Sequence, residues 1–224
     1  WLHAVEESFT NMIKYQREGL LMSVLDVPNG QILNGSALEI IDSLPPNYYQ
    51  TCITSPPYWG LRDYGINDQV GAEQLLDDYI KNITKIFSKI KHVLRDDGIL
   101  WLNIGDSYTS GNRTWRDGDK KNPGRAMSYR PPTPEGLKPK DLIGVPWKIA
   151  FALQNDGWYL RSDIIWNKPN CQPESVKDRP TRSHEYIFML TKSKKYYYDY
   201  EAIKEYTADH TSKKNKRTVW NINT

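Results

Sequence analysis

Residues 51–58 read Thr-Cys-Ile-Thr-Ser-Pro-Pro-Tyr, an apolar run that ends in two consecutive prolines and a tyrosine. The run predicts a strand over residues 51–55. The prolines end that strand, because a proline fixes its φ angle and has no amide hydrogen to continue a ladder of hydrogen bonds. The sequence therefore predicts a rigid corner that carries unpaired carbonyl groups, the hydroxyl of Ser55 and the ring of Tyr58.

This corner has two interpretations. Ser55 Oγ and the Pro56 carbonyl can accept both hydrogens of an exocyclic amine, while the ring of Tyr58 stacks on the flat face of a nucleobase. The alternative is an ordinary Pro-Pro turn in which Tyr58 caps the core. The residues of the corner alone leave both interpretations open.

Helical and extended patterns alternate outward from the corner. The clearest predicts a helix over residues 73–94, whose apolar residues repeat at helical spacing with lysines on the opposite face. The other expected elements are strands at 31–35, 99–104, 158–166 and 185–190, a short helix that begins at Ser36, and a helix at 141–155 with Asp141 as its N-cap. This alternation predicts a layered α/β domain in which crossover connections make the strand pairings parallel, with ligands beyond the carboxyl ends of the strands.

Two further segments differ in character from this domain. Residues 1–30 are expected to form an N-terminal helical extension. Residues 109–140 are rich in glycine and proline and lack an apolar period, which predicts a long surface loop inserted in the domain. This loop carries eight basic residues against three acidic ones, with Trp115 and Tyr129 among them, and so suits phosphates and bases; the alternative is a solvated loop.

The composition excludes several classes of protein. Two cysteines and four scattered histidines among 224 residues exclude a disulfide scaffold and a zinc site of familiar spacing. No apolar stretch reaches membrane-spanning length and no signal peptide is visible, so a cytoplasmic protein is expected. The first residue is Trp1, and we expect the chain to be a piece of a longer polypeptide.

Five blocks in order resemble a known family, the amino-directed DNA methyltransferases of the permuted type, whose catalytic motif precedes the cofactor motif. The resemblance covers roughly residues 31–224. Its blocks are Thr-Ser-Pro-Pro-Tyr-Trp-Gly-Leu-Arg-Asp-Tyr at 54–64, Leu-Trp-Leu-Asn-Ile-Gly-Asp-Ser-Tyr at 100–108, Lys-Pro-Lys-Asp-Leu-Ile-Gly-Val-Pro-Trp at 138–147, Asp-Ile-Ile-Trp-Asn-Lys-Pro-Asn at 163–170, and the stretch from Pro173 to Tyr186.

The resemblance implies a Rossmann-like class I methyltransferase sheet flanked by helices, with the catalytic half mostly present. It implies transfer of a methyl group from S-adenosylmethionine to the exocyclic amine of a base flipped out of double-stranded DNA. Family members with serine at the first motif position tend to modify cytosine at N4, so Ser55 favours cytosine over adenine N6. A restriction endonuclease partner is possible, and the oligomeric state is left open.

The resemblance also assigns roles to residues. Ser55, Pro56, Pro57 and Tyr58 are the expected catalytic group. The expected cofactor contacts are Asn34, Ser36, Thr54 and Ser55. No metal is expected. The residues expected to contact DNA are Trp59, Arg62, Arg113, Arg116, Lys120, Lys121, Arg125, Arg179 and Arg182.

Two departures from the family pattern affect the cofactor half. The family commonly has Gly-Asp where this chain has Gly35-Ser36, and no glycine-rich cofactor loop follows residues 219–224. The chain is therefore expected to be truncated before that loop. The alternatives are a non-catalytic DNA-binding fragment of such an enzyme, or a methyltransferase that acts on RNA or a protein amide.

Overall fold

The computed structural model describes residues 22–27, 30–110, 113, 115–118, 126–127 and 130–223. The chain divides into two compact units, residues 1–46 and residues 47–224. The boundary follows the two prolines at 45 and 46, not the expected junction near residue 30.

The first unit contains a hairpin and a short helix. Strand β1 (Met22–Val27) pairs antiparallel with β2 (Gly30–Gly35), and helix α2 (Ala37–Ser43) follows. Residues 22–27 are thus extended where a helical extension was expected over 1–30, and the helical pattern of residues 1–20 lies outside the described residues. Ser36 is the N-cap residue of α2, although its side chain makes no capping hydrogen bond.

The second unit is built on a five-stranded sheet in the order β3-β4-β6-β5-β9. These strands are β3 (Tyr49–Thr54), β4 (Leu94–Ile104), β5 (Tyr159–Asn167), β6 (His184–Thr191) and β9 (Val219–Asn221). Helix α3 (Leu76–Val93) connects β3 to β4, and helix α4 (Val145–Asn155) precedes β5. The alternation of strands and helices predicted from the sequence is therefore confirmed.

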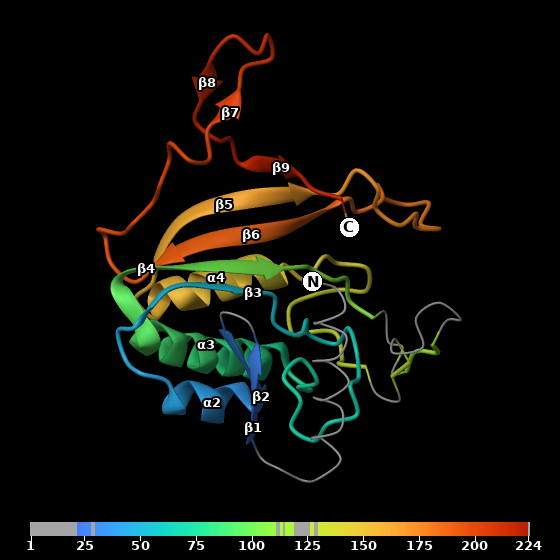
Figure 1. The fold of residues 1–224 in the computed structure, drawn as a ribbon. Helices are drawn as coiled ribbons and strands as arrows, with labels where there is room; N and C mark the ends of the chain where they lie inside the picture. Colours follow the sequence, from blue (N-terminus) through green and yellow to red (C-terminus); the bar gives the residue numbers. More distant parts are fainter. Residues whose placement is uncertain are drawn as a thin grey trace. The chain divides into compact units, whose positions relative to one another are not determined.

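The expectation that all pairings are parallel is wrong for β6. Strand β6 runs antiparallel to both of its neighbours, β4 and β5, whereas β3–β4 and β5–β9 are parallel (Figure 1). The segment from 168 to 183 between β5 and β6 contains no helix. A parallel return needs a crossover that is usually helical, and without one the chain turns back antiparallel.

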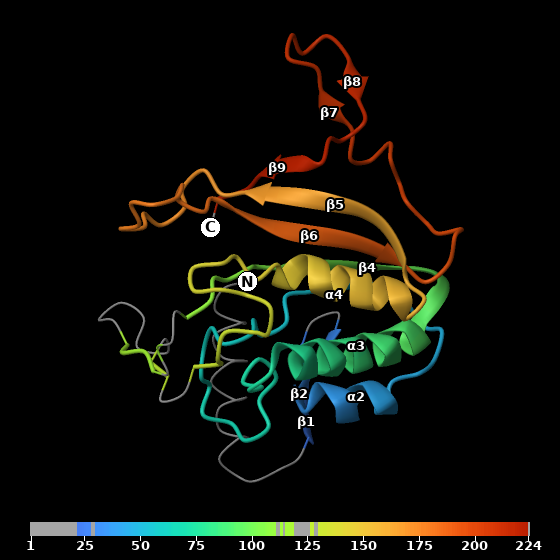
Figure 2. The same ribbon diagram turned by 180° about the vertical axis from the view of Figure 1, so that it is seen from behind.

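The core lies between the sheet and the helices α3 and α4, which cover the same face (Figure 2). Tyr79, Ile83 and Phe87 form the buried stripe of α3 and are at most 2% exposed. Leu100, Leu102 and Ile104 of β4 point toward them. Burial of side chains of this size stabilises a fold by about 1.5–3 kcal/mol each, so this stripe fixes how α3 sits on the sheet.

The second long helix begins later than predicted. Asp141 was expected as its N-cap, but α4 begins at Val145 with Gly144 as the N-cap residue at a φ of 77°. Asp141 instead accepts a hydrogen bond from the Lys138 amide, which closes a turn. The amides at the start of α4 are capped by Asp106, a residue from the end of β4 that no local sequence pattern could pair with this helix.

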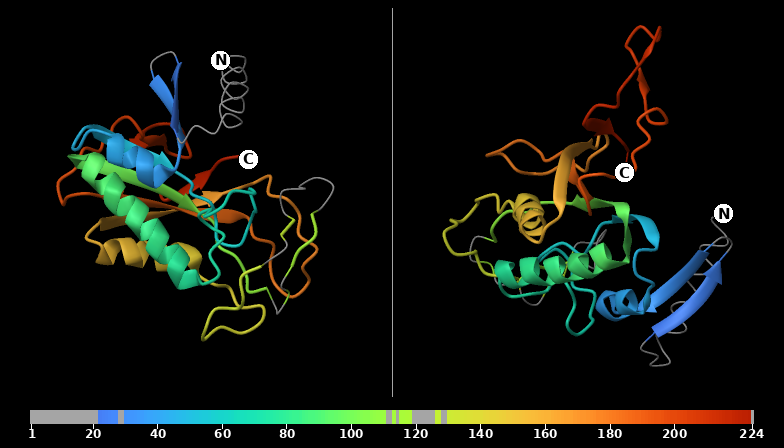
Figure 3. Two further views of the ribbon diagram at one scale, coloured as in Figure 1. Left: turned by 90° about the horizontal axis from the view of Figure 1, so that it is seen from below. Right: turned by 90° about the vertical axis from the view of Figure 1, so that its left-hand side faces the viewer.

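The opposite face of the sheet carries a pocket of about 570 Å³. It is lined by Ile99 and Trp101 of β4, by Trp220 of β9, and by residues around Tyr197 and Ile203. Beyond that segment, β7 (Glu205–Tyr206) and β8 (Lys213–Lys214) form a short hairpin that extends away from the sheet (Figures 1 and 3). In the described residues, no helix combines the length and apolar character that a bilayer crossing needs.

Candidate functional site

Four elements of the second unit bring polar side chains to one edge of the sheet. Ser55 and Tyr58 follow the end of β3, Asn103 lies at the end of β4 and Lys168 follows β5. Glu185 belongs to the start of β6, which reaches the same edge because β6 runs antiparallel to its neighbours. Hydrogen bonds connect all five residues.

The hydroxyl groups of Ser55 and Tyr58 form a chain that ends on a carboxylate. Ser55 Oγ donates to the Tyr58 hydroxyl oxygen at 3.2 Å, and the Tyr58 hydroxyl donates to Glu185 Oε2 at 2.7 Å. Ser55 is exposed and Tyr58 is half-buried. These hydrogen bonds therefore lead from the exposed Ser55 hydroxyl to the carboxylate of Glu185 at this edge of the sheet.

Glu185 is held by a cation. Lys168 Nζ forms an ion pair with Glu185 Oε1, and both side chains are largely buried, with exposed fractions of 18% and 20%. The same ammonium lies 4.3 Å from the centre of the Trp166 ring. Burial raises the pKa of Glu185, but the hydrogen bonds from Lys168, Tyr58 and Asn103 outweigh it and lower that pKa below its ordinary value. Glu185 is therefore ionised at neutral pH.

Asn103 connects the same groups from β4. Its Nδ2 lies 3.0 Å from Glu185 Oε2, 3.0 Å from the Tyr58 hydroxyl and 3.4 Å from Ser55 Oγ. Its Oδ1 is buried and accepts no hydrogen bond from the described residues. The two N–H groups of Asn103 are thus shared among three oxygens of the site, and the contact with Ser55 Oγ is the longest.

The ring of Tyr58 is fixed by packing as well as by its hydroxyl. A Cβ atom at Gly105 would lie 2.6 Å from Tyr58 Cε2, so only glycine allows the ring to lie this close to the end of β4. Burial and the nearby Glu185 carboxylate raise the pKa of the Tyr58 phenol, which therefore stays protonated and able to donate.

The two proline carbonyls differ in their partners. The Pro57 carbonyl accepts a hydrogen bond from the buried Tyr79 hydroxyl at 2.8 Å. Within the described residues, no hydrogen-bond donor reaches the Pro56 carbonyl. The corner thus presents two acceptors that retain free lone pairs, Ser55 Oγ and the Pro56 oxygen.

Asp106 organises the backbone next to this site. Its Oδ1 accepts hydrogen bonds from the amides of Ser107, Gly144 and Val145, each at 2.9 Å, and its side chain is 3% exposed. Arg182 Nη1 lies 3.9 Å from Asp106 Oδ2. A carboxylate at a helix N-terminus is stabilised by the helix dipole, so Asp106 attaches the end of β4 to the start of α4.

Trp59 does not have the exposed position expected of a DNA contact. Its side chain is 4% exposed and belongs to the core, and its indole N–H donates to the Glu73 carbonyl at 2.8 Å. The buried N–H needs a partner, and Glu73 supplies one inside the fold. Trp59 therefore packs the loop against the core.

The expected DNA contacts at Arg62 and in the basic loop fall into three groups. Arg62 and Arg113 are exposed, as a phosphate contact requires. Arg116 is half-buried and donates to the Leu61 carbonyl, while its backbone pairs with Met127. The expected contacts outside the described residues are Lys120, Lys121 and Arg125.

The two arginines of the loop before β6 already have partners within the chain. Arg179 donates to Glu174 Oε2 at 2.6 Å, and its guanidinium lies 4.0 Å from the centre of the Tyr108 ring. Arg182 lies beside Asp106, with an exposed fraction of 16%. These contacts favour a role in positioning the loop, and their role toward DNA stays a prediction.

The expected cofactor contacts lie in both units. Thr54 is half-buried at the end of β3, next to the exposed Ser55, in the second unit. Asn34 and Ser36 belong to the first unit, at the end of β2 and the start of α2. In the described part of the chain, no group of three or more histidine, cysteine or acidic side chains is arranged to bind a metal ion.

Three residues of the network were not predicted from the sequence: Asn103, Lys168 and Glu185. The signal that was available is the segment 168–183, which lacks an apolar helical period and so favours an antiparallel return of β6. That return would have placed the first residues of β6 beside the ends of β4 and β5.

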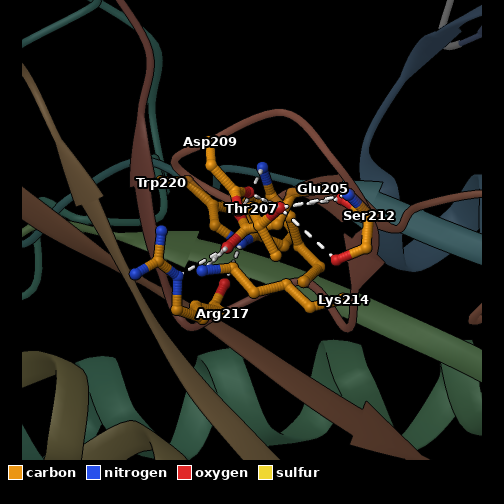
Figure 4. Close-up of polar contacts among 8 residues, drawn as sticks. Glu205, Thr207, Asp209, Ser212, Lys214, Arg217 and Trp220 are labelled. Atoms are coloured by element: carbon orange, nitrogen blue, oxygen red, sulfur yellow. Dashed lines mark hydrogen bonds and ion pairs between the residues drawn. The ribbon is translucent and has the colours of Figure 1, made fainter.

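The basic run at 213–217 forms part of an internal network. Glu205 accepts a hydrogen bond from Arg217 at 2.5 Å, and Lys214 and Lys216 lie 3.9 and 3.7 Å from its oxygens. Figure 4 shows Arg217 and Lys214 directed toward Glu205, with Thr207 beside them. These cations therefore hold the β7–β8 hairpin together.

Comparisons with known proteins identify the family of the chain. The DNA methylase family of N6/N4 type matches residues 49–224. The chain is 69% identical to the Type II methyltransferase M.SmaI of Serratia marcescens over 195 residues, which cover 87% of this chain and 67% of that protein. It is 62% identical to the Type II methyltransferase M.Cfr9I of Citrobacter freundii over 200 residues, which cover 89% of this chain and 66% of that protein. The chain thus spans about two thirds of the length of these relatives.

A solved structure shares the fold. The PvuII DNA methyltransferase, described as cytosine-N4-specific, matches with a TM-score of 0.57 and 14% sequence identity over 84% of this chain and 55% of that one. This likeness confirms the predicted Rossmann-like class I methyltransferase fold. With a family match over most of its length and relatives of high identity, the chain belongs to the N6/N4 family of DNA methylases.

Proposed function

We propose that the full-length protein transfers a methyl group from S-adenosylmethionine to the exocyclic amine of a base in double-stranded DNA. The observation that carries this proposal is the pair of open acceptors at the end of β3, Ser55 Oγ and the Pro56 carbonyl, beside the fixed ring of Tyr58. The high identity to two Type II methyltransferases supports the same reaction class.

The proposed chemistry of the corner is positional. An exocyclic amine is a poor nucleophile, because its lone pair is delocalised into the aromatic ring of the base. Two acceptors that hold both amine hydrogens, Ser55 Oγ and the Pro56 oxygen, favour a pyramidal nitrogen whose lone pair is available for attack. Stacking on Tyr58 contributes roughly 1–3 kcal/mol, which offsets much of the cost of flipping the base. Orientation and electrostatics then lower the barrier, and the nitrogen, which becomes acidic as it gains the methyl group, releases one proton to solvent without a strong base.

The described residues fit the methyl-acceptor side of this reaction and only part of the methyl-donor side. They supply the open acceptors for the amine, but no described turn provides a glycine-rich cradle for the adenosyl group. Thr54 and Ser55 at the end of β3 are the proposed cofactor contacts of the second unit.

Cytosine N4 is the proposed target, because Ser55 occupies the first position of the catalytic motif. The test is to treat unmethylated DNA with the full-length protein and S-adenosylmethionine, digest it, and identify the nucleosides by mass. N4-methylcytosine is the expected product. N6-methyladenine alone would reverse the base assignment, and methylation of RNA but not DNA would favour the alternative substrate.

Replacement of Ser55 tests the mechanism. Ser55→Ala removes one of the two acceptors and should lower kcat by about 100-fold, within the range found for removing one preorganised hydrogen-bonding group. Full activity of Ser55→Ala would remove Ser55 from the mechanism. Binding of S-adenosylmethionine, measured by titration calorimetry, separates an enzyme from a non-catalytic DNA-binding protein.

A further inference from the structure

The direction of the hydrogen bonds around Ser55 follows from which groups can donate. A carboxylate only accepts, so the Tyr58 hydroxyl must donate its single hydrogen to Glu185. The Tyr58 oxygen is then an acceptor toward Ser55, and the Ser55 hydroxyl hydrogen points inward to it. Asn103 Nδ2, which is a donor only, approaches Ser55 Oγ at 3.4 Å and is compatible with the same direction.

This direction decides what Ser55 presents to a substrate. With its hydrogen directed to Tyr58, Ser55 Oγ retains a lone pair on its exposed side. A base amine bound there finds an acceptor. If Tyr58 instead donated its hydrogen to Ser55, that hydrogen bond would occupy the lone pair of Ser55 Oγ. The hydroxyl hydrogen of Ser55 would then face the amine of the base. The two N–H groups of the amine are donors in the plane of the base, so neither could accept that hydrogen.

We propose that Glu185 and its partner Lys168 are positioning residues that fix the direction of the Tyr58–Ser55 hydrogen bonds, so that Ser55 accepts from the substrate amine. This inference rests on the proposed function. Neither residue lies in the Ser-Pro-Pro-Tyr corner, and both act through Tyr58, whose hydroxyl joins the corner to the carboxylate.

Lys168 completes the arrangement because it keeps the carboxylate charged. Its ammonium is confined between Glu185 and the Trp166 ring, and both partners of the ion pair are about four-fifths buried. Without this cation, a buried carboxylate would favour its protonated form. A protonated carboxyl group can donate a hydrogen bond to Tyr58, which would reverse the direction of the hydrogen bonds between Tyr58 and Ser55.

The primary experiment combines Glu185→Gln with Tyr58→Phe in the full-length protein. Glu185→Gln should lower kcat by about 10- to 100-fold, while KM for DNA changes less than about 3-fold. The reason is that the hydrogen bonds directed by Glu185 act on the reacting amine and not on the contacts that bind the DNA backbone. Since Glu185 acts through the Tyr58 hydroxyl, the double variant should be no slower than Tyr58→Phe alone, within about 3-fold. Glu185→Asp, which keeps the charge, should recover part of the lost kcat.

The matched control is Glu201→Gln, which removes a carboxylate paired with Lys204 at 2.7 Å away from this edge. It should leave kcat unchanged, alone and in the Tyr58→Phe background. A Glu185→Gln variant that keeps kcat within about 2-fold of the unaltered protein, or whose loss multiplies with that of Tyr58→Phe, would overturn the proposal.

Two outcomes need to be kept apart. If the unaltered protein methylates no nucleic acid, the proposed function fails; if it is active and Glu185→Gln is normal, only the positioning role fails. Thermal melting establishes whether Glu185→Gln is folded. If it is not, Tyr58→Phe and Ser55→Ala carry the same test, because the effect of losing the Tyr58 hydroxyl should disappear when the Ser55 hydroxyl is absent.

Discussion

The ring of Tyr58 lies so close to Gly105 that a β-carbon on residue 105 would be 2.6 Å from Tyr58 Cε2. Gly105 follows the last residue of β4, and Tyr58 follows the end of β3. The two strand ends are therefore matched to each other by shape. This contact, together with the hydrogen bond to Glu185, sets the position of the ring on which a base is proposed to stack.

Replacement of Gly105 should displace that ring. Gly105→Ala is expected to lower kcat by roughly 10-fold or more, because moving a positioning group by about 1 Å can cost 100-fold. Gly105→Val should have a larger effect. Steady-state methylation kinetics measure the loss, and adding Gly105→Ala to Tyr58→Ala should cost little more. If Gly105→Ala lowered kcat by the same factor in the protein with Tyr58 and in the Tyr58→Ala variant, Gly105 would act through a residue other than Tyr58.

Asp106 should contribute to stability through the start of α4. Asp106→Ala removes three hydrogen bonds from partly buried amides and should lower the free energy of unfolding by about 2–3 kcal/mol. Urea denaturation measures this loss. Asp78→Ala on α3, which removes a carboxylate from an exposed pair with Lys81, is the control and should change the free energy by less than about 1 kcal/mol. A similar effect of both variants would contradict the capping role.

The basic loop should determine how DNA binding depends on salt. Lys120, Lys121 and Arg125 are predicted phosphate contacts, so replacing all three with alanine should reduce the slope of log K against log salt by about 1 per residue. Fluorescence anisotropy with labelled duplex DNA across a salt series measures the slope. Lys81→Ala on α3 removes one positive charge elsewhere and should leave it unchanged. An unaltered slope in the triple variant would show that the loop is merely solvated.

The β7–β8 hairpin should respond to acid. The hydrogen bond from Arg217 lowers the pKa of Glu205, as do Lys216 and Lys214, although burial opposes them. A carboxylate with a lowered pKa stabilises the folded hairpin above its ordinary pKa, and this contribution is lost as the pH falls through the folded value.

The amide signals of Thr207 and Lys214 in NMR spectra should therefore stay unchanged down to about pH 4.3, the ordinary pKa of glutamate, and shift as the pH falls further. Glu205→Gln should show the acid-like spectrum at neutral pH. Signals in Glu205→Gln that match those of the unaltered protein at neutral pH would contradict the role of this ion network.

Much of the second unit could be predicted because its signals are local. The apolar repeat over residues 73–94 predicted α3, and the apolar runs predicted β3, β5 and β6 within two residues of their observed bounds. The strand predicted at 99–104 is the second half of β4, which already begins at Leu94. The start of α4 was missed because its cap, Asp106, is distant in sequence. The direction of β6 was missed because period and propensity indicate that a segment is extended, and not which way it runs.

The sequence by itself determined the alternation of strands and helices, the Ser-Pro-Pro-Tyr corner and the family, because each is written in neighbouring residues or in ordered blocks. Only the tertiary structure decided that Glu185, Lys168 and Asn103 meet at that corner, and that Trp59 is buried while the Pro56 carbonyl stays open. These relationships join residues up to 127 positions apart. They depend on strand order and direction, which the packing of the whole sheet selects.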